Sequence, residues 1–126
     1  MIDTAQAYLN EEAVGNAWKK SGVNRDEIFL VSKVWHSNYG EGQTMKSIDE
    51  SLRKLQTDYI DLKLLHQPYC DRYGAYRDLE KAYKAGSNFA LGFLIGLSSI
   101  EKYSNCFRLT ITPRKGVKVI VVSKGI

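Results

Sequence analysis

The chain has 126 residues, 44% of them hydrophobic and 25% charged, which indicates one globular domain over residues 1–126 and argues against a disordered segment. No apolar run approaches the roughly 20 residues that cross a bilayer, and the N-terminus has no basic start followed by an apolar stretch. We therefore expect a cytoplasmic protein with no membrane partner.

The net charge of +4 is unevenly distributed along the chain. Residues 1–101 carry a net −2 and residues 102–126 a net +6. Because the cations of the C-terminal segment are scattered among apolar residues without a pattern of stacking aromatic side chains, we expect no nucleic-acid partner. Cys70 and Cys106 have neither a metal-ligand spacing nor a disulfide framework, and we expect both to be free thiols.

The first half of the chain predicts a strand, a helix and a second strand. Residues 1–5 are typical of the end of a strand, and Asn10 is placed to cap a helix that ends at Gly22. The apolar, β-branched run at residues 28–34 predicts a strand that is buried on both faces. Residues 37–42 predict a turn.

The middle of the chain continues this alternation. Apolar residues recur every three or four positions between Met45 and Leu55 and predict a second helix. The next strand covers residues 59–66 and is stopped by Pro68, after which residues 69–74 predict a loop.

A third helical stripe begins at Tyr76 and ends at Gly86. Two further apolar runs, residues 89–97 and 117–122, predict strands. Alternating strands and helices favour an α/β fold of parallel βαβ units, with right-handed crossovers and helices on the outside.

Three polar side chains stand where the predicted parallel strands end. Asp3 closes the first strand, Lys33 lies inside an apolar strand, and His66 ends the next one. The carboxyl ends of parallel strands meet at one edge, where α/β proteins bind ligands. Because a charge inside an apolar strand is costly unless paired, we expect Lys33 to pair with Asp3. Taken singly, the three residues also have ordinary interpretations: a loop cap, a snorkelling lysine and a hydrogen-bonded core histidine.

Four sequence motifs stand in a fixed order. They are IDTAQAY with NEEAVG (residues 2–15), VSKVW (residues 31–35), LRKLQTDYIDL (residues 52–62) and LLHQP (residues 64–68). Together they resemble the aldo-keto reductase family, especially bacterial members similar to diketogluconate and methylglyoxal reductases. The resemblance covers residues 1–86, whereas residues 87–126 diverge. It implies a (β/α)8 TIM barrel, and because a complete barrel takes about 250 residues, we expect a partial, truncated one.

Carried over by position, the resemblance implies the catalytic residues Asp3, Tyr8, Lys33 and His66. It also implies NADPH or NADH as cofactor and a small aldehyde or ketone as substrate. Tyr8 would donate the proton, and Lys33, held by Asp3, would ease the loss of that proton. His66 would bind, orient and polarise the substrate carbonyl.

Trp35 matches a position that often lines the substrate pocket in the family, although ordinary packing of an indole explains it equally well. We expect the neighbouring His36 to be a solvent-facing or loop histidine. The resemblance places cofactor contacts at Asp3 and at a turn near residue 98. One alignment keeps only the Ala90-Leu91-Gly92 segment, whereas the alignment that we favour makes Ser98 and Ser99 the residues that hold the nicotinamide.

Two hypotheses about function follow from this resemblance. In the first, the chain is an NAD(P)H-dependent reductase of aldehydes and ketones. In the second, it is a catalytically inactive remnant that lacks a competent cofactor site and acts only through association with another chain. Because an incomplete barrel exposes strand edges and apolar surface, we expect self-association through these edges.

Overall fold

The computed structural model describes residues 1–67, 69–85 and 91–93. Short 3₁₀ helices (η) separate the strands and α-helices. In chain order the elements are β1 (Ile2–Asp3), η1 (Gln6–Tyr8), α1 (Glu11–Ser21), η2 (Arg25–Glu27), β2 (Leu30–Val34), η3 (His36–Asn38), α2 (Gln43–Leu55), β3 (Leu62–Leu65), α3 (Arg72–Lys84) and β4 (Leu91–Phe93).

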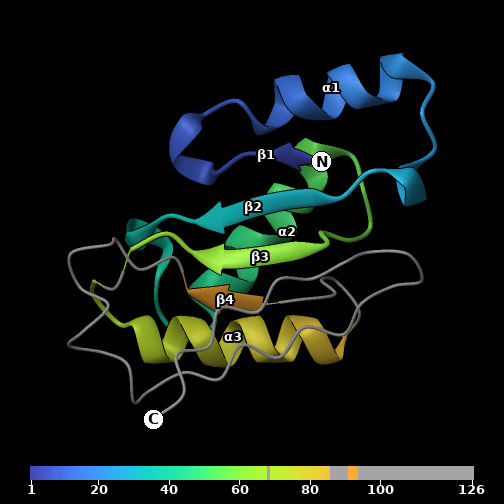
Figure 1. The fold of residues 1–126 in the computed structure, drawn as a ribbon. Coiled ribbons are helices and arrows are strands. Elements are labelled where there is room, and N and C mark those ends of the chain that lie inside the picture. The colour runs from blue at the N-terminus through green and yellow to red at the C-terminus, as the bar shows by residue number, and fades with distance from the viewer. Residues whose placement is uncertain (68, 86–90, 94–126) are drawn as a thin grey trace, which may run out of the picture.

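The four strands form one parallel sheet in the order β1-β2-β3-β4, and their arrows point the same way in Figure 1. Each strand pairs with the next one along the chain, and one α-helix lies between each pair of consecutive strands. Since right-handed crossovers put every helix on the same side of a sheet whose strand order never reverses, this topology is that of a barrel segment. The parallel βαβ units predicted from the sequence are confirmed.

Strand β2 is buried along its whole length, as its apolar composition predicts. Its register with β3 places Ser32 opposite Lys63 and Lys33 opposite Leu64. Because side chains alternate between the two faces of a strand, Ser32 and Lys63 share one face and Lys33 lies on the other. The register therefore directs two buried lysines, Lys33 and Lys63, to opposite faces of the sheet, although both lie inside apolar strand segments of the sequence.

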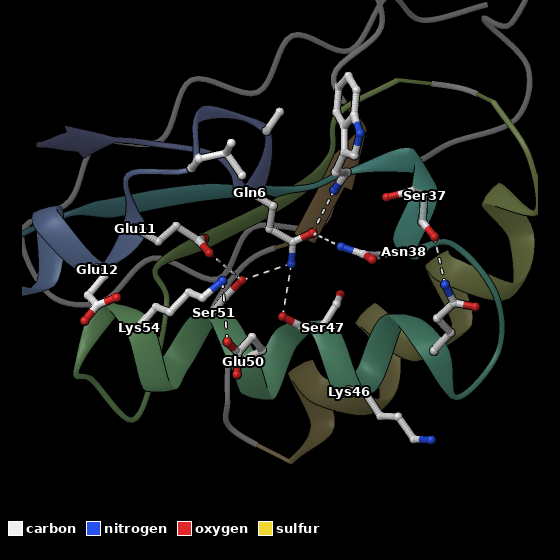
Figure 2. Close-up of a pocket in the computed structure, with 14 residues that line it drawn as sticks. Gln6, Glu11, Glu12, Ser37, Asn38, Lys46, Ser47, Glu50, Ser51 and Lys54 are labelled. Carbon is white, nitrogen blue, oxygen red and sulfur yellow. Dashed lines mark hydrogen bonds and ion pairs between the residues drawn. The ribbon is translucent and has the colours of Figure 1, made fainter.

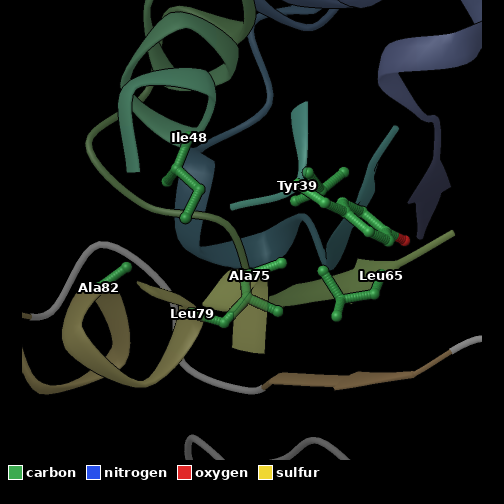
Figure 3. Close-up of a cluster of buried hydrophobic side chains, with 7 residues drawn as sticks. Tyr39, Ile48, Leu65, Ala75, Leu79 and Ala82 are labelled. Carbon is green, nitrogen blue, oxygen red and sulfur yellow. The ribbon is translucent and has the colours of Figure 1, made fainter. Parts of the chain in front are cut away.

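The main hydrophobic cluster lies between the sheet and helices α2 and α3 (Figure 3). Its fully or nearly fully buried members are Val34, Tyr39, Ile48, Leu65, Ala75, Leu79 and Ala82. A smaller cluster of Leu30, Leu55 and Ile60 lies beside it, and Leu52 contacts both. The amphipathic stripe predicted between Met45 and Leu55 is thus the face of α2 that packs on the sheet.

Helices α1 and α2 approach closely at Gly15. A Cβ atom at this position would lie 2.4 Å from the carbonyl oxygen of Lys54, so only glycine fits without a shift of backbone. One turn later the indole N–H of the buried Trp18 donates to the carbonyl oxygen of Leu55, 2.7 Å away. The last carbonyl groups of α2 are therefore partly satisfied by α1.

The helix termini differ in part from the sequence prediction. Helix α1 starts after Asn10 and ends before Gly22, but the expectation that the Asn10 side chain caps it is wrong. The Asn10 Oδ1 atom accepts a hydrogen bond from the Thr4 hydroxyl instead, at 2.7 Å. Helix α2 receives its cap from another element, because Oδ2 of the buried Asp78 accepts from the backbone N–H groups of Gly42 and Met45.

The loop predicted over residues 69–74 is shorter than expected. Helix α3 already begins at Arg72, because the Asp71 carboxylate accepts from the Gly74 N–H group at 2.9 Å and so caps the first turn. The strand predicted over residues 89–97 contains β4, and the strand predicted over residues 117–122 lies outside the described residues.

Candidate active site

The carboxyl ends of β1, β2 and β3 bring three of the predicted residues to the same edge of the sheet. Asp3 is the last residue of β1, Lys33 is the penultimate residue of β2, and His66 directly follows β3. Tyr8 follows β1 by way of η1, the short turn at residues 6–8. The strand topology therefore gathers side chains that are up to 63 positions apart in the sequence.

Lys33 is almost completely buried and has the partner that a buried cation requires. Its ammonium forms an ion pair with Oδ1 of Asp3 and donates to the carbonyl oxygen of Thr4 at 3.1 Å. The Asp3 side chain is 53% exposed, whereas that of Lys33 is 5% exposed. The pairing predicted from the sequence is confirmed, and it holds the lysine against the end of β1.

Tyr8 lies beside this pair and remains open to solvent. The Lys33 ammonium is 5.2 Å from the centroid of the Tyr8 ring, and the tyrosine is 52% exposed. The Tyr8 and His66 rings meet edge to face, with centroids 5.9 Å apart and an interplanar angle of 87°. The four residues that the resemblance singled out thus lie in one group.

His66 is held as a neutral ring. Burial lowers its pKa below the ordinary value of 6.5, the Lys33 ammonium and His36 lower it further, and Asp3 opposes the shift. Its Nδ1 atom is buried and has no hydrogen-bond partner among the described residues. A neutral imidazole carries one N–H donor, which suits a carbonyl oxygen as acceptor.

Trp35 and His36 extend the ring contacts away from the site. Trp35 packs against His66 with centroids 5.3 Å apart, and His36 packs against Trp35 at 4.2 Å. The expectation of a loop or solvent-facing histidine at position 36 is only partly met, because His36 lies in η3, is half-buried and also contacts the Tyr69 ring at 6.1 Å. Trp35 therefore stands next to the group of four.

Sequence reasoning missed a second buried polar cluster on the opposite face of the sheet. Lys63 is fully buried, with its ammonium 3.9 Å from Glu11 Oε1 and within 3.1 Å of the hydroxyls of Ser32 and Ser51. Burial lowers the pKa of Lys63 to about 8, Glu11 opposes this shift and Lys33 adds to it. The signal that could have found it is the one that found Lys33, a lysine inside an apolar strand.

A hollow of about 790 Å³ lies between η1 and helix α2 (Figure 2). It is lined by polar side chains of α2 and by Gln6, Asn38 and Trp35. Tyr8, Lys33 and His66 do not line it. The hollow is therefore distinct from the group of four residues, although Trp35 borders both.

The described residues suit the reactive end of a nicotinamide cofactor. Asp3 and Tyr8 are about half exposed, so a carboxylate and a phenol border an open end of the sheet. Ser98 and Ser99, the other predicted cofactor contacts, lie outside the described residues. Over the described ranges there is no group of three or more His, Cys, Asp or Glu that could hold a metal ion, and no helix long and apolar enough to span a membrane.

Comparison with known proteins identifies relatives of the chain. The model of the family described as "Aldo/keto reductase family" matches residues 1–122, past residue 86 where the motif resemblance ends. Glyoxal reductase of Bacillus subtilis is 49% identical over 92 residues, which cover 72% of this chain and 33% of that protein. Methylglyoxal reductase DkgB of Yersinia pestis is 51% identical over 67 residues, which cover 53% of this chain and 25% of that protein.

A solved structure shares the fold of most of this chain. A Bombyx mori aldo-keto reductase in complex with NADP superposes with a TM-score of 0.69 and 32% sequence identity over 73% of this chain and 34% of that one. The chain thus spans about a third of the length of these relatives or less. The fold is α/β, with parallel strands and outer helices that form part of a TIM barrel.

Proposed function

The chain belongs to the aldo/keto reductase family, and from this premise we propose that it carries the catalytic groups for reducing a small aldehyde or ketone to an alcohol with NADPH or NADH. The observation that supports this proposal is the meeting of Tyr8, Lys33, Asp3 and His66 at one end of the sheet. Carbonyl reduction needs one proton donor, one group that stabilises the donor after proton loss, and one group that orients the carbonyl.

Tyr8 is the proton donor in this proposal. Its phenol transfers a proton to the carbonyl oxygen, and the Lys33 ammonium stabilises the phenolate that remains. Asp3 and the Thr4 carbonyl oxygen hold the lysine in place for this role. Because Tyr8 is half exposed, it is accessible to an entering substrate.

His66 orients the substrate. Its lowered pKa keeps the imidazole neutral at pH 7, so it donates a hydrogen bond to the carbonyl oxygen without competing with Tyr8 to transfer a proton. Asp3 would hold the nicotinamide beside the site, Ser98 and Ser99 are the further contacts predicted from the sequence, and the bound cofactor would supply the hydride for the carbonyl carbon. Hydride on carbon and the Tyr8 proton on oxygen together give the alcohol.

The choice of a substrate to test rests on Trp35 and on the names of the relatives. Trp35 is the large apolar side chain beside His66, and it would pack against the substrate. Relatives named glyoxal reductase and methylglyoxal reductase make small dicarbonyl compounds the first substrates to test.

Direct measurement on the purified chain tests the proposal. NADPH is titrated by fluorescence, and its oxidation is followed with and without methylglyoxal. We expect saturable binding and aldehyde-dependent oxidation that Tyr8→Phe abolishes. Tyr73→Phe is the matched control, because Tyr73 is 50% exposed and Tyr8 52% exposed, while Tyr73 belongs to helix α3. Equal oxidation by both variants contradicts the role of Tyr8.

A second candidate is an inactive chain that acts through association with another chain. Within the described sheet, β1 is an edge strand of only two residues, and edge strands offer unpaired backbone groups to other chains. This candidate expects no cofactor binding at millimolar NADPH and a concentration-dependent mass in light scattering. A monodisperse monomer with a sharp, cooperative unfolding transition argues against it.

A further inference from the structure

The side-chain amide of Gln6 uses all of its hydrogen-bonding capacity inside the protein (Figure 2). Its Nε2 donates to the carbonyl oxygen of Ser47 and the hydroxyl of Ser51, both at 3.0 Å. Its Oε1 accepts from the backbone N–H of Trp35 at 2.8 Å and from Asn38 Nδ2 at 2.9 Å. A glutamine amide has two donor hydrogens and two acceptor lone pairs, so none is left for solvent or ligand.

The orientation of this amide is determined by its backbone partners. The N–H of Trp35 can only donate and the carbonyl of Ser47 can only accept, so a flipped amide would face like groups on both sides. The four bonds join η1 to the end of β2, to η3 and to helix α2, across sequence separations of 29 to 45 residues. Gln6 thus links η1 to the residue that follows β2, to η3 and to α2.

The bonds of Gln6 continue into the buried cluster behind the sheet. The Ser51 hydroxyl, which accepts from Gln6, also accepts from the Lys63 ammonium at 3.0 Å and donates to Glu11 Oε2 at 3.2 Å. Lys63 and Glu11 are buried and belong to β3 and α1. Gln6 is therefore anchored on an interior network rather than on a mobile surface group.

The turn that carries Tyr8 is short and lies at the surface. Helix η1 is three residues long and none of its residues is buried. It ends at Leu9, which has a left-handed backbone with φ of 55° and is 93% exposed. Since a single 3₁₀ turn is not stable by itself, its position depends on tertiary contacts, and the Gln6 amide supplies four of them.

We propose that Gln6 is a positioning residue, which fixes the Tyr8 ring relative to His66 and Trp35 through its four hydrogen bonds to Trp35, η3 and α2. It sits two residues before Tyr8 on the same turn and binds the backbone N–H of Trp35, so one side chain sets the spacing of two rings that contact His66. This inference rests on the proposed role of Tyr8 as proton donor. Gln6 itself contacts no reacting atom.

The two histidine rings allow an NMR measurement of the position of Tyr8 that does not require catalytic turnover. The chain contains two of them, His36 and His66, so their ring signals are readily distinguished by NMR. The His66 ring lies against both Tyr8 and Trp35, so we expect nuclear Overhauser contacts from His66 to each ring. Loss of the Tyr8 contact in a folded chain reports displacement of the turn.

The test replaces Gln6 by methionine, which keeps the length of the side chain and removes all four bonds. We expect Gln6→Met to lose the Tyr8–His66 contact while the Trp35–His66 contact persists, with unfolding still cooperative. Gln43→Met is the matched control, because Gln43 also borders the hollow but makes one hydrogen bond, to the Ser37 carbonyl oxygen. This control retains both contacts. A Gln6→Met chain that keeps the Tyr8–His66 contact at wild-type intensity overturns the proposal.

Two further variants keep the proposal testable if Gln6→Met fails to fold. Asn38→Ala removes the side-chain bond to the amide, whereas Ser51→Ala also removes the bonds of Ser51 to Lys63 and Glu11. Ser51→Ala and Asn38→Ala each remove one partner of the amide, and we expect a graded weakening of the Tyr8–His66 contact. Unchanged contacts in both variants count against it. With methylglyoxal and NADPH, we expect a fall in kcat that exceeds the change in KM. Absence of turnover in the unmodified chain refutes the proposed function alone, because the ring contacts are measured without cofactor.

Discussion

The ammonium of Lys33 lies 5.2 Å from the centroid of the Tyr8 ring, on the side of β2 opposite to the buried Lys63 cluster. The same ammonium is ion-paired with Asp3, so its position is determined by the end of the neighbouring strand. A cation that is nearly buried and close to an accessible phenol is suited to stabilise a phenolate.

Replacing Lys33 by methionine removes the cation beside Tyr8. We expect aldehyde-dependent NADPH oxidation to fall by about 10²-fold or more, because assisted proton transfer is worth roughly that much. The chain should still fold, since the Asp3 carboxylate left behind is 53% exposed and remains solvated. Thermal unfolding and initial rates measure the two effects. Lys46→Met, at an exposed position on α2, serves as control, and equal rates in both variants contradict the prediction.

Because His66 is neutral in the folded chain, we expect the free energy of unfolding to fall at acid pH. Because burial and the neighbouring cations lower the pKa of His66 in the folded chain, the unfolded chain takes up the proton at higher pH. The stability that His66 contributes is therefore present above about pH 6.5 and is lost as the pH falls through its folded pKa. Denaturant titrations at pH 7 and pH 5 should show a smaller pH effect in His66→Gln. An NMR titration that places the His66 pKa above 6.5 is incompatible with this prediction.

Lys63 should make the free energy of unfolding depend on pH at the alkaline end of the range. Its pKa is lowered from 10.5 to about 8, chiefly by burial, so the folded chain releases the proton before the unfolded chain does. Stability contributed by this residue should therefore rise between about pH 8 and pH 10.5. Comparing the pH dependence of unfolding free energy in the unmodified chain and in Lys63→Met isolates it from the tyrosines. An identical slope in the two chains over this range refutes the assignment.

A side chain at position 15 should clash between helices α1 and α2. A methyl group at this position meets the Lys54 carbonyl oxygen at 2.4 Å, so α1 and α2 must separate. We expect Gly15→Ala to lower the free energy of unfolding by about 1–3 kcal/mol, the usual cost of overpacking, despite the better helix propensity of alanine. Lys20→Ala, at an exposed position of the same helix, should change stability little. Urea unfolding compares them, and a stabilised Gly15→Ala chain would falsify the close approach.

The order of elements could be predicted because it depends on local pattern. The apolar run at residues 28–34 contains β2, the stripe between Met45 and Leu55 lies within α2, and Gly22 ends α1. These features follow from backbone preferences and the spacing of apolar residues. The motif around Tyr8 likewise singled out one of eight tyrosines by its spacing from Asp3. The role assigned to that tyrosine stays a prediction.

The N-terminal caps of helices α1 and α2 could not be predicted, because the partners of the side chains involved lie elsewhere in the sequence. Asn10 stands at the start of α1, yet its side chain bonds Thr4, whereas α2 is capped by Asp78 from α3. A polar residue at a helix start can bond its own helix or a neighbour, and the sequence does not say which. The four partners of Gln6 likewise come from segments 29 to 45 positions away.

The alternation of strands and helices, the family motifs and the need of Lys33 for an acidic partner can all be read from the amino-acid order alone. That Lys33 faces Tyr8, while Lys63 faces Glu11 on the other side of the sheet, is seen only in the folded chain. The two lysines are separated by the register of β2 and β3, which places Lys63 beside Ser32 rather than beside Lys33. A shift by one residue would exchange the faces, because side chains alternate along a strand, and such pairing is set by contacts between distant segments.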